Sequence, residues 1–401
     1  TPLFYILTNT RSYPVGDVVR INREIANGLQ AANQRTGRAF TVISRSDSTL
    51  RGHYPLETDV LIKCLGLSQA VCLIIPYFLE GGRFTINDTH YVVEDDQWTP
   101  ASETPFANDA VFGFGTSNLR AWVEEKTQGR IAAEEVVSLD LQTIREQGPD
   151  GVVDLLSATP AGGVVVVNAL SMRDIEVVVA GALAAERAGQ SLIYRTAASF
   201  VRARAGLEKQ PLLSGKDLVA GDTTAGGLVV VGSHVPKTTA QLQHLLDKDM
   251  MQAVEFNVKQ FIAAESKEAY ISEIGRLLDQ YLSNGTSCVL FTSRELITGA
   301  SDEANLQLSQ QISGGLVNIV QTLEVRPRYL VAKGGITSSD VATKALGIRR
   351  AMVKGQILPG IPVWAPDEKA TFPGLCYVVF PGNVGSVEAL AEAIQKLEET
   401  S

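Results

Sequence analysis

The sequence predicts an α/β protein of two domains, each a mostly parallel sheet flanked by helices. Two observations support this fold class. Runs of Val and Ile without polar alternation, such as residues 164–167, indicate strands buried on both faces, and stretches with helical character follow them. The chain of 401 residues is also longer than one hydrophobic core usually supports, which favours two domains of about 200 residues each.

Strands and helices alternate along the first half. We expect strands at residues 3–7, 40–43, 71–76 and 164–168, with helices over residues 18–36 and from the last strand to Ala188. Periodic signals fade between Asp88 and Asn118, where Asp, Glu, Pro and Thr dominate. That stretch is predicted to be either a functional loop or a disordered surface insertion.

The composition changes to Gly, Lys, Pro, Asp and Thr between residues 205 and 227. We place the domain boundary there, which gives domains of residues 1–205 and 206–401. A second series then follows, with strands expected at residues 227–231, 288–291, 328–332 and 375–380, and helices at 236–246, 304–323 and from Ser386.

Charge and hydropathy limit the class of partner. A net charge of −9 argues against binding to nucleic acid or anionic lipid, which requires clustered Lys and Arg. No apolar run approaches the roughly 20 residues that cross a bilayer, and no signal peptide precedes the first strand, so we expect a soluble cytoplasmic protein.

The four cysteines lack CxxC spacing and are expected to be reduced core residues. A homodimer is compatible with these properties.

Three loops in the second half follow the ends of expected strands and carry glycines. They are residues 232–234, 334–337 and 381–386. Glycines at such turns let the backbone approach a phosphate at the start of a helix, and Ser338-Ser339-Asp340 would cap a helix over residues 341–346. Because ligands bind at the carboxyl ends of parallel strands, the loops are expected to converge on one nucleotide. The alternative is three ordinary turns with helix caps.

A dense polar run, residues 44–53, follows an expected strand of the first half. Its arginines could grip a carboxylate while Asp47 receives hydroxyl groups, as a site for a polyhydroxy acid requires. Arg11 and Arg83 lie at equivalent strand ends; surface ion pairs are the alternative for each arginine. His53 and His234 have no partner at metal-ligand spacing, which favours capping or packing over metal binding.

Residues 46–52, 333–340 and 381–386 resemble motifs of the four-carbon acid sugar kinase family, and the resemblance covers nearly the whole chain. It implies an N-terminal domain that binds a tetronate-type acid and a C-terminal domain that binds ATP with Mg²⁺. It also implies an active site in the interdomain cleft, where the γ-phosphoryl group passes to a terminal hydroxyl. The chain contains no P-loop, GxGxxG or GxSxG motif, so ATP would be bound by other loops.

The resemblance assigns Asp47 and Arg51 to the acid site, and Ser233, Gly334, Gly335 and residues 382–385 to the nucleotide site. Neighbouring residues and residues at equivalent strand ends complete both sets of candidates. In the acid site these are Arg11, Ser46, Asp47, Arg51 and Arg83, with Asp47 as base or hydroxyl-orienting group. Around the nucleotide they are Ser233, Lys333, Gly334, Gly335, Thr337, Gly382, Asn383 and Gly385, with simple solvation as the alternative for Lys333. Family members usually carry an Asp-Asp-x-Thr-Gly type motif after their first strand, and this sequence opens at Thr1 without it. We therefore expect the first domain to lack that strand, and the general base stays unassigned.

Two other functions are compatible with the same fold. A nicotinamide-dependent oxidoreductase of sugar acids would share two α/β domains, although the missing GxGxxG motif counts against it. A sugar-acid binding protein without catalysis would need no second, phosphate-binding site. For a kinase, the resemblance implies threonate, erythronate or 3-oxo-tetronate as the substrate, and the Asp-Ser-Thr-Leu-Arg-Gly form of residues 47–52 is more similar to the threonate and erythronate kinases.

Overall fold

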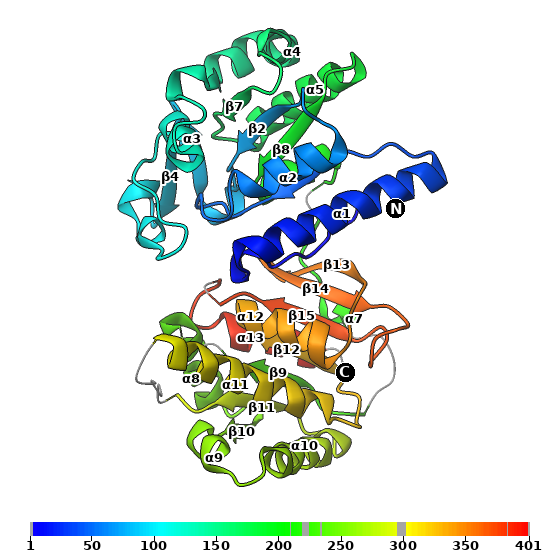
Figure 1. The fold of residues 1–401 in the computed structure, drawn as a ribbon. Coiled ribbons are helices and arrows are strands. Elements are labelled where there is room, and N and C mark those ends of the chain that lie inside the picture. The colour runs from blue at the N-terminus through cyan, green and yellow to red at the C-terminus, as the bar shows by residue number, and fades with distance from the viewer. Residues whose placement is uncertain are drawn as a thin grey trace. The chain divides into compact units, whose positions relative to one another are not determined.

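The computed structural model describes residues 3–208, 210–218, 224–232, 235–294, 302–382 and 384–399. The chain divides into two compact units, Thr1–Lys209 and Gln210–Ser401 (Figure 1). Each unit is built on one large, mostly parallel sheet with helices packed against it, which confirms the predicted fold class. None of the helices in the described ranges is long and apolar enough to cross a membrane.

The first unit contains a parallel sheet of order β1-β8-β2-β7-β6. Its strands are β1 (Ile43–Arg45), β2 (Val71–Ile75), β6 (Val137–Leu139), β7 (Val164–Val167) and β8 (Leu192–Thr196). Its helices are α1 (Val15–Thr36), α2 (Leu56–Leu65), α3 (Leu119–Thr127), α4 (Gly148–Ala158), α5 (Met172–Arg187) and α6 (Ala198–Arg204). The predicted helix after β7 and the predicted strands at β2 and β7 are confirmed.

Alternation along the strands divides the interior of this unit into two cores. Leu73 and Ile75 of β2 point into a core that also contains residues of α4 and α5. Cys72 and Ile74 point into the opposite core, which α2 and α3 complete. All five side chains of β2 are buried, as continuous apolar runs require in a sheet covered on both faces.

Two expectations for the first unit are wrong. Residues 3–7 form no strand, and the side chains of Phe4 to Leu7 are exposed by 47–60%. An apolar run becomes a strand only when a neighbouring strand accepts its hydrogen bonds and a core covers it, and the sheet here ends at β1. The second is the disordered insertion proposed as one alternative for Asp88 to Asn118, because this stretch contains two strands of a small antiparallel sheet.

That sheet has the order β3-β4-β5 and consists of β3 (Arg83–Ile86), β4 (Thr89–Glu94) and β5 (Gln97–Pro100). Two-residue turns join its strands: Asn87-Asp88 and Asp95-Asp96, and all four residues have positive φ. Asn and Asp tolerate this backbone conformation, which matches the twist of hairpin strands in type I′ turns. Consecutive Asn and Asp residues were therefore the available sequence signal.

The second unit contains a seven-stranded sheet of order β10-β11-β9-β12-β15-β14-β13. The strands are β9 (Leu228–Val231), β10 (Gln252–Phe256), β11 (Cys288–Thr292), β12 (Tyr329–Lys333), β13 (Ala351–Leu358), β14 (Ile361–Pro366) and β15 (Cys376–Phe380). The helices are α7 (Gly215–Leu218), α8 (Pro236–Asp247), α9 (Val258–Ala263), α10 (Lys267–Ser283), α11 (Asp302–Gln321), α12 (Gly335–Asp340) and α13 (Ala389–Glu398). The first five strands in this order are parallel, and β14 and β13 add an antiparallel hairpin at the edge.

Candidate functional site

The polar run of the first unit begins where β1 ends, at the carboxyl edge of the parallel sheet. The Ser46 amide donates a hydrogen bond to the Thr196 carbonyl over 2.8 Å, and its hydroxyl donates to the same oxygen over 3.3 Å. Ser46 therefore ties the loop to the end of β8, its neighbour in the sheet. The predicted strand at 40–43 is displaced, because β1 spans Ile43–Arg45.

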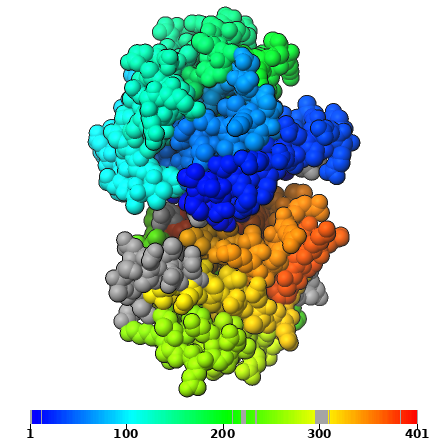
Figure 2. Space-filling view, in the orientation of Figure 1, coloured from blue at the N-terminus to red at the C-terminus, as the bar shows by residue number. Residues whose placement is uncertain are grey.

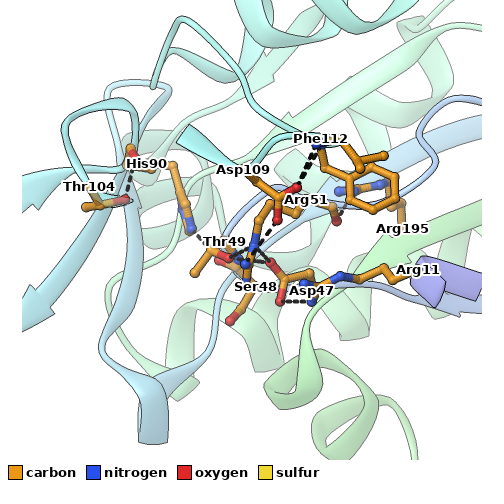
Figure 3. A network of polar contacts seen from close by, with 12 residues as sticks. Arg11, Asp47, Ser48, Thr49, Arg51, His90, Thr104, Asp109, Phe112 and Arg195 are labelled. Carbon is orange, nitrogen blue, oxygen red and sulfur yellow. Dashed lines mark hydrogen bonds and ion pairs between the residues drawn. The ribbon is translucent and has the colours of Figure 1, made fainter. Parts of the chain in front are cut away.

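Asp47 is the centre of a dense polar network (Figure 3). Its carboxylate accepts hydrogen bonds from Arg51 Nε at 3.1 Å and Arg11 Nη1 at 3.3 Å, and from both the amide and the hydroxyl of Thr49. Burial would raise the pKa of Asp47, but Arg51, Thr49 and Arg11 outweigh it and hold the pKa below its usual value. Asp47 is thus a carboxylate at neutral pH, suited to accept hydrogen bonds from hydroxyl groups.

Arg51 joins this loop to the segment after the small sheet. Its Nη1 lies 3.5 Å from Asp109 Oδ2, and Asp109 Oδ1 accepts the amides of Val111 and Phe112 at 3.0 Å each. The guanidinium also lies 4.9 Å from the centroid of the Phe106 ring. Arg51 is therefore already shared between two carboxylates, so little of its charge is left unbalanced.

Arg83 reaches the same aromatic ring from β3. Its guanidinium lies 5.5 Å from the Phe106 centroid and donates to the Gly81 carbonyl. Its ion-pair partner is Glu94, 3.7 Å away and itself largely exposed. The structure thus brings together four of the predicted acid-site residues, Arg11, Asp47, Arg51 and Arg83, around one loop. His53 packs its ring edge on Phe112 and contacts the Thr10 carbonyl at 3.0 Å, as expected for a packing residue.

Sequence reasoning missed two buried residues of this region. His90 on β4 is fully buried between the Thr85 hydroxyl at 3.0 Å and the Ser48 carbonyl at 2.8 Å, and burial lowers its pKa to about 4. It is therefore a neutral link between the small sheet and the Asp47 loop. Arg195, the second missed residue, lies in β8 and is 2% exposed. The available signal was a charged residue inside the apolar run of β8.

In the second unit, the three predicted loops leave the sheet side by side. The register places Lys333, the last residue of β12, opposite Val231 of β9 and Phe380 of β15. The loops after these strands therefore share one edge, as the sequence predicted. Ser233, His234 and Asn383 lie outside the described residues.

Lys333 is neither solvated nor on the surface of this edge. It is fully buried, and its ammonium donates to the carbonyls of Pro381 at 2.7 Å and Gly382 at 3.1 Å. The ammonium also lies 4.1 Å from the centroid of the Phe380 ring. Desolvation lowers its pKa to about 7, and the charge of Lys237 adds to the shift. Lys333 therefore fixes the position of the loop after β15.

The glycine turn after β12 begins a helix earlier than predicted. Gly334 has φ 124°, a conformation that favours glycine, and α12 starts at Gly335. Ser338 to Asp340 consequently lie inside α12 and do not cap a later helix, and a π-helical turn, Val341–Ala345, follows. The capping prediction was wrong because the glycine pair itself provides the turn into the helix.

Two glycines of this edge have opposite surroundings. A Cβ on Gly335 would meet nothing within 4 Å beyond its chain neighbours and its own helix, so there is open space beside this residue. A Cβ on Gly232 would lie 2.5 Å from Thr337 Oγ1 and 2.9 Å from Leu316 Cδ1. Gly232 is thus required by packing against Thr337, whereas open space at Gly335 leaves room for a ligand to approach the backbone.

The loop after β15 is held by side chains of α8 that sequence reasoning missed. The Thr238 hydroxyl donates to the Gly382 carbonyl at 3.1 Å. Gln241 Nε2 donates to the carbonyls of Val384 at 3.1 Å and Ser386 at 2.6 Å. Gly385, at φ 85°, follows Val384 in the left-handed region. These hydrogen bonds hold Gly382, Val384 and Ser386 against α8.

Within the described ranges, no group of three or more His, Cys, Asp and Glu side chains could hold a metal ion. Mg²⁺ in nucleotide sites keeps several waters and binds substrate phosphates with only one or two carboxylates. None of the described residues is assigned to Mg²⁺.

Comparisons with known proteins agree with the division of the chain into two units. A family model described as a sugar-binding N-terminal domain matches residues 1–204, and one described as a nucleotide-binding C-terminal domain matches residues 228–390. No curated protein matches the chain. The structure is similar to protein HI1011 of Haemophilus influenzae, with a TM-score of 0.66, 19% identity, and coverage of 97% of this chain and 88% of that chain.

A second similar structure is a Salmonella typhimurium LT2 protein described provisionally as a tRNA synthase. Its TM-score is 0.68 at 18% identity, with coverage of 96% of this chain and 86% of that chain. At these identities the two structures support the fold alone.

Proposed function

We propose that this chain, which belongs to the four-carbon acid sugar kinase family, transfers the γ-phosphoryl group of ATP to the terminal hydroxyl of a four-carbon sugar acid. Threonate, erythronate and 3-oxo-tetronate are the candidate acceptors. The observation that carries the proposal is the presence of a sugar-binding and a nucleotide-binding domain in one chain. We assign the acid to residues 1–205 and the nucleotide to residues 206–401.

On the acid side, Asp47 is the proposed catalytic residue. Its lowered pKa makes it a weak base, so its main contribution is to accept a hydrogen bond from the hydroxyl that attacks and to orient it. Phosphoryl transfer through a loose transition state asks for in-line placement more than for strong base catalysis. Arg11, Ser46, Arg51 and Arg83 are the proposed residues around the acid.

On the nucleotide side, we assign phosphate binding to the edge where β9, β12 and β15 end. Gly335, an exposed residue at the start of α12 with open space beside it, supports this assignment. Lys333, Gly334, Thr337, Gly382 and Gly385 shape the two loops, and Ser233 and Asn383 belong to the same proposed set. Mg²⁺, bound to the phosphates, would neutralise the charge that develops during transfer.

A substrate panel tests the proposal. The protein is incubated with ATP, Mg²⁺ and each acid in turn, and ADP is followed with a reaction lacking acid as control. We expect ADP formation that depends on one acid and a phosphorylated product. If no acid supports ADP formation, the proposed kinase activity is refuted. Acid oxidation with a nicotinamide cofactor, or acid binding without turnover, would support the oxidoreductase or the binding protein instead.

A further inference from the structure

Arg195 is the one site-region arginine in the described chain with no carboxylate partner. Only 2% of it is exposed, and its sole hydrogen bond, from Nη2 to the Arg51 carbonyl, has a length of 3.5 Å at the limit for such bonds. The two carboxylates whose charges act on Arg195 are those of Glu57 and Asp47, and both have other partners. Glu57 accepts a hydrogen bond from the Thr10 hydroxyl at 2.6 Å, and Asp47 forms ion pairs with Arg51 and Arg11.

Aromatic contacts compensate for only part of this burial. The Arg195 guanidinium lies 4.9 Å from the Trp122 centroid and 5.1 Å from the Tyr54 centroid. These two rings stack on each other at 4.8 Å. Within the described residues, the Arg51 carbonyl is the one acceptor that the Arg195 guanidinium meets. Cation–π attraction is weaker than the cost of removing an unpaired ion from water. An arginine buried in this state is suited to receive an anion.

The position of Arg195 connects it to the acid site. It lies in β8, beside β1 in the sheet, and the residue after it, Thr196, accepts the Ser46 amide of the Asp47 loop. Its hydrogen bond to the Arg51 carbonyl places it directly against the same loop (Figure 3). Arg51 itself is already balanced by Asp47 and Asp109, so its fork is not free for another carboxylate.

We infer that Arg195 binds the carboxylate of the sugar acid and thereby selects acids over uncharged polyols of the same length. The inference rests on the proposed substrate class but not on catalysis. The ionised carboxylate of the ligand supplies the missing acceptor, while Asp47 receives hydroxyl hydrogens on the same loop. Burial strengthens the new ion pair because water no longer competes for it.

The experiment measures acid binding without nucleotide, by calorimetry with threonate, erythronate and 3-oxo-tetronate, and with erythritol as the uncharged probe. In R195M, we expect the affinity for the preferred acid to fall roughly tenfold to a hundredfold, because a hydrogen-bonded charge pair is lost. The affinity for erythritol should be unchanged. Equal acid affinity in R195M and wild type would overturn the inference.

Stability separates ligand binding from a structural role. Arg204 is the matched control, because its partly buried guanidinium also lies against an aromatic ring, that of Tyr194, but has a carboxylate partner in Glu186. R204M should lower Tm and leave acid affinity unchanged, since it leaves Glu186 without its cation. R195M should lower Tm less than R204M does, because no carboxylate loses a partner. A larger drop in R195M, without a change in acid affinity, contradicts the inference.

Two further outcomes are decisive. Should R195M fail to fold, R195K retains the charge without the planar fork: weakened acid binding with unchanged erythritol binding supports the inference, and wild-type affinity overturns it. Wild-type protein that binds no acid overturns both this inference and the proposed substrate class. Acid binding lost in R195M, in a protein that forms no ADP, supports Arg195 while refuting the kinase.

Discussion

Substitution of Gly335 by Ala separates folding from nucleotide binding. Gly335 begins α12 without a positive φ, and a Cβ there would have no other heavy atom within 4 Å. Ala therefore fits the backbone, and it restricts the unfolded chain more than Gly does. We expect G335A to raise the free energy of unfolding by about 0.4–1 kcal/mol. For a domain of this size that corresponds to an increase in Tm of roughly 1–4 °C.

The same methyl group would occupy the space that a phosphate needs to reach the Gly335 amide. Loss of one hydrogen bond to a charged group costs about 1.5–3 kcal/mol, which weakens ATP binding by tenfold or more. We expect the KM for ATP to rise by this factor while the KM for the acid stays unchanged. Thermal unfolding with and without ATP and Mg²⁺ gives the change in stability and the change in ATP affinity on one sample. Steady-state kinetics gives the two KM values.

G232A is the control, because its added methyl group meets protein atoms instead. The new Cβ would lie 2.5 Å from Thr337 Oγ1 and 2.9 Å from Leu316 Cδ1, and overpacking of this kind costs about 1–3 kcal/mol. G232A should therefore lower Tm, in contrast to G335A. Unchanged ATP affinity in G335A would show that no phosphate approaches this amide, and a lower Tm would show that α12 does not tolerate a side chain there.

Three further predictions concern charged or buried side chains. D47N should lower kcat by about a hundredfold or more, measured as ADP release, and full turnover would remove Asp47 from the mechanism. The pKa of Lys333 is about 7 in the folded state and about 10.4 in the unfolded state, so the unfolded state binds more protons between these two pH values. The stability of wild type relative to K333M should therefore rise with pH over this range, by up to ~1.4 kcal/mol per pH unit, as measured by denaturant titration. The pKa of His90 is about 4 in the folded state and about 6.5 in the unfolded state, so the free energy of unfolding of wild type should fall by up to roughly 3 kcal/mol as the pH drops through that interval. The urea midpoint of H90Q should depend less on pH over the same interval.

The architecture was predictable because strong periodic signals dominate most of the chain. Apolar runs such as β7 and β11 can be buried only in a covered sheet. In the second unit, glycines after β9, β12 and β15 mark the carboxyl edge. Weakly patterned elements were missed. β10 has side chains exposed at three of five positions, and Gly355 and Pro362 interrupt the apolar residues of the β13–β14 hairpin. The pairing of these strands therefore depends on neighbours that the local sequence does not specify.

The candidate sites were predictable only as loops. The sequence located the Asp47 loop and the Gly334 turn from strand-to-helix transitions, but it did not show which partners each side chain would take. Pairing of Arg51 with Asp109 joins positions that are 58 residues apart in the sequence. The support of the loop after β15 by Thr238 likewise depends on tertiary packing. Such partners follow from the fold, not from local spacing.

The two buried cations show most clearly what tertiary structure adds. Arg195 and Lys333 each lie in an apolar strand at the carboxyl edge of a sheet, and sequence alone gives them the same description. Lys333 meets two carbonyls and a ring, so its desolvation is partly offset within the protein and its effect passes through the loop that it holds. Arg195 meets rings and one distant carbonyl, which leaves its charge for a ligand. The same chemical change should therefore act on different ligands: K333M on ATP through the loop, and R195M on the acid directly.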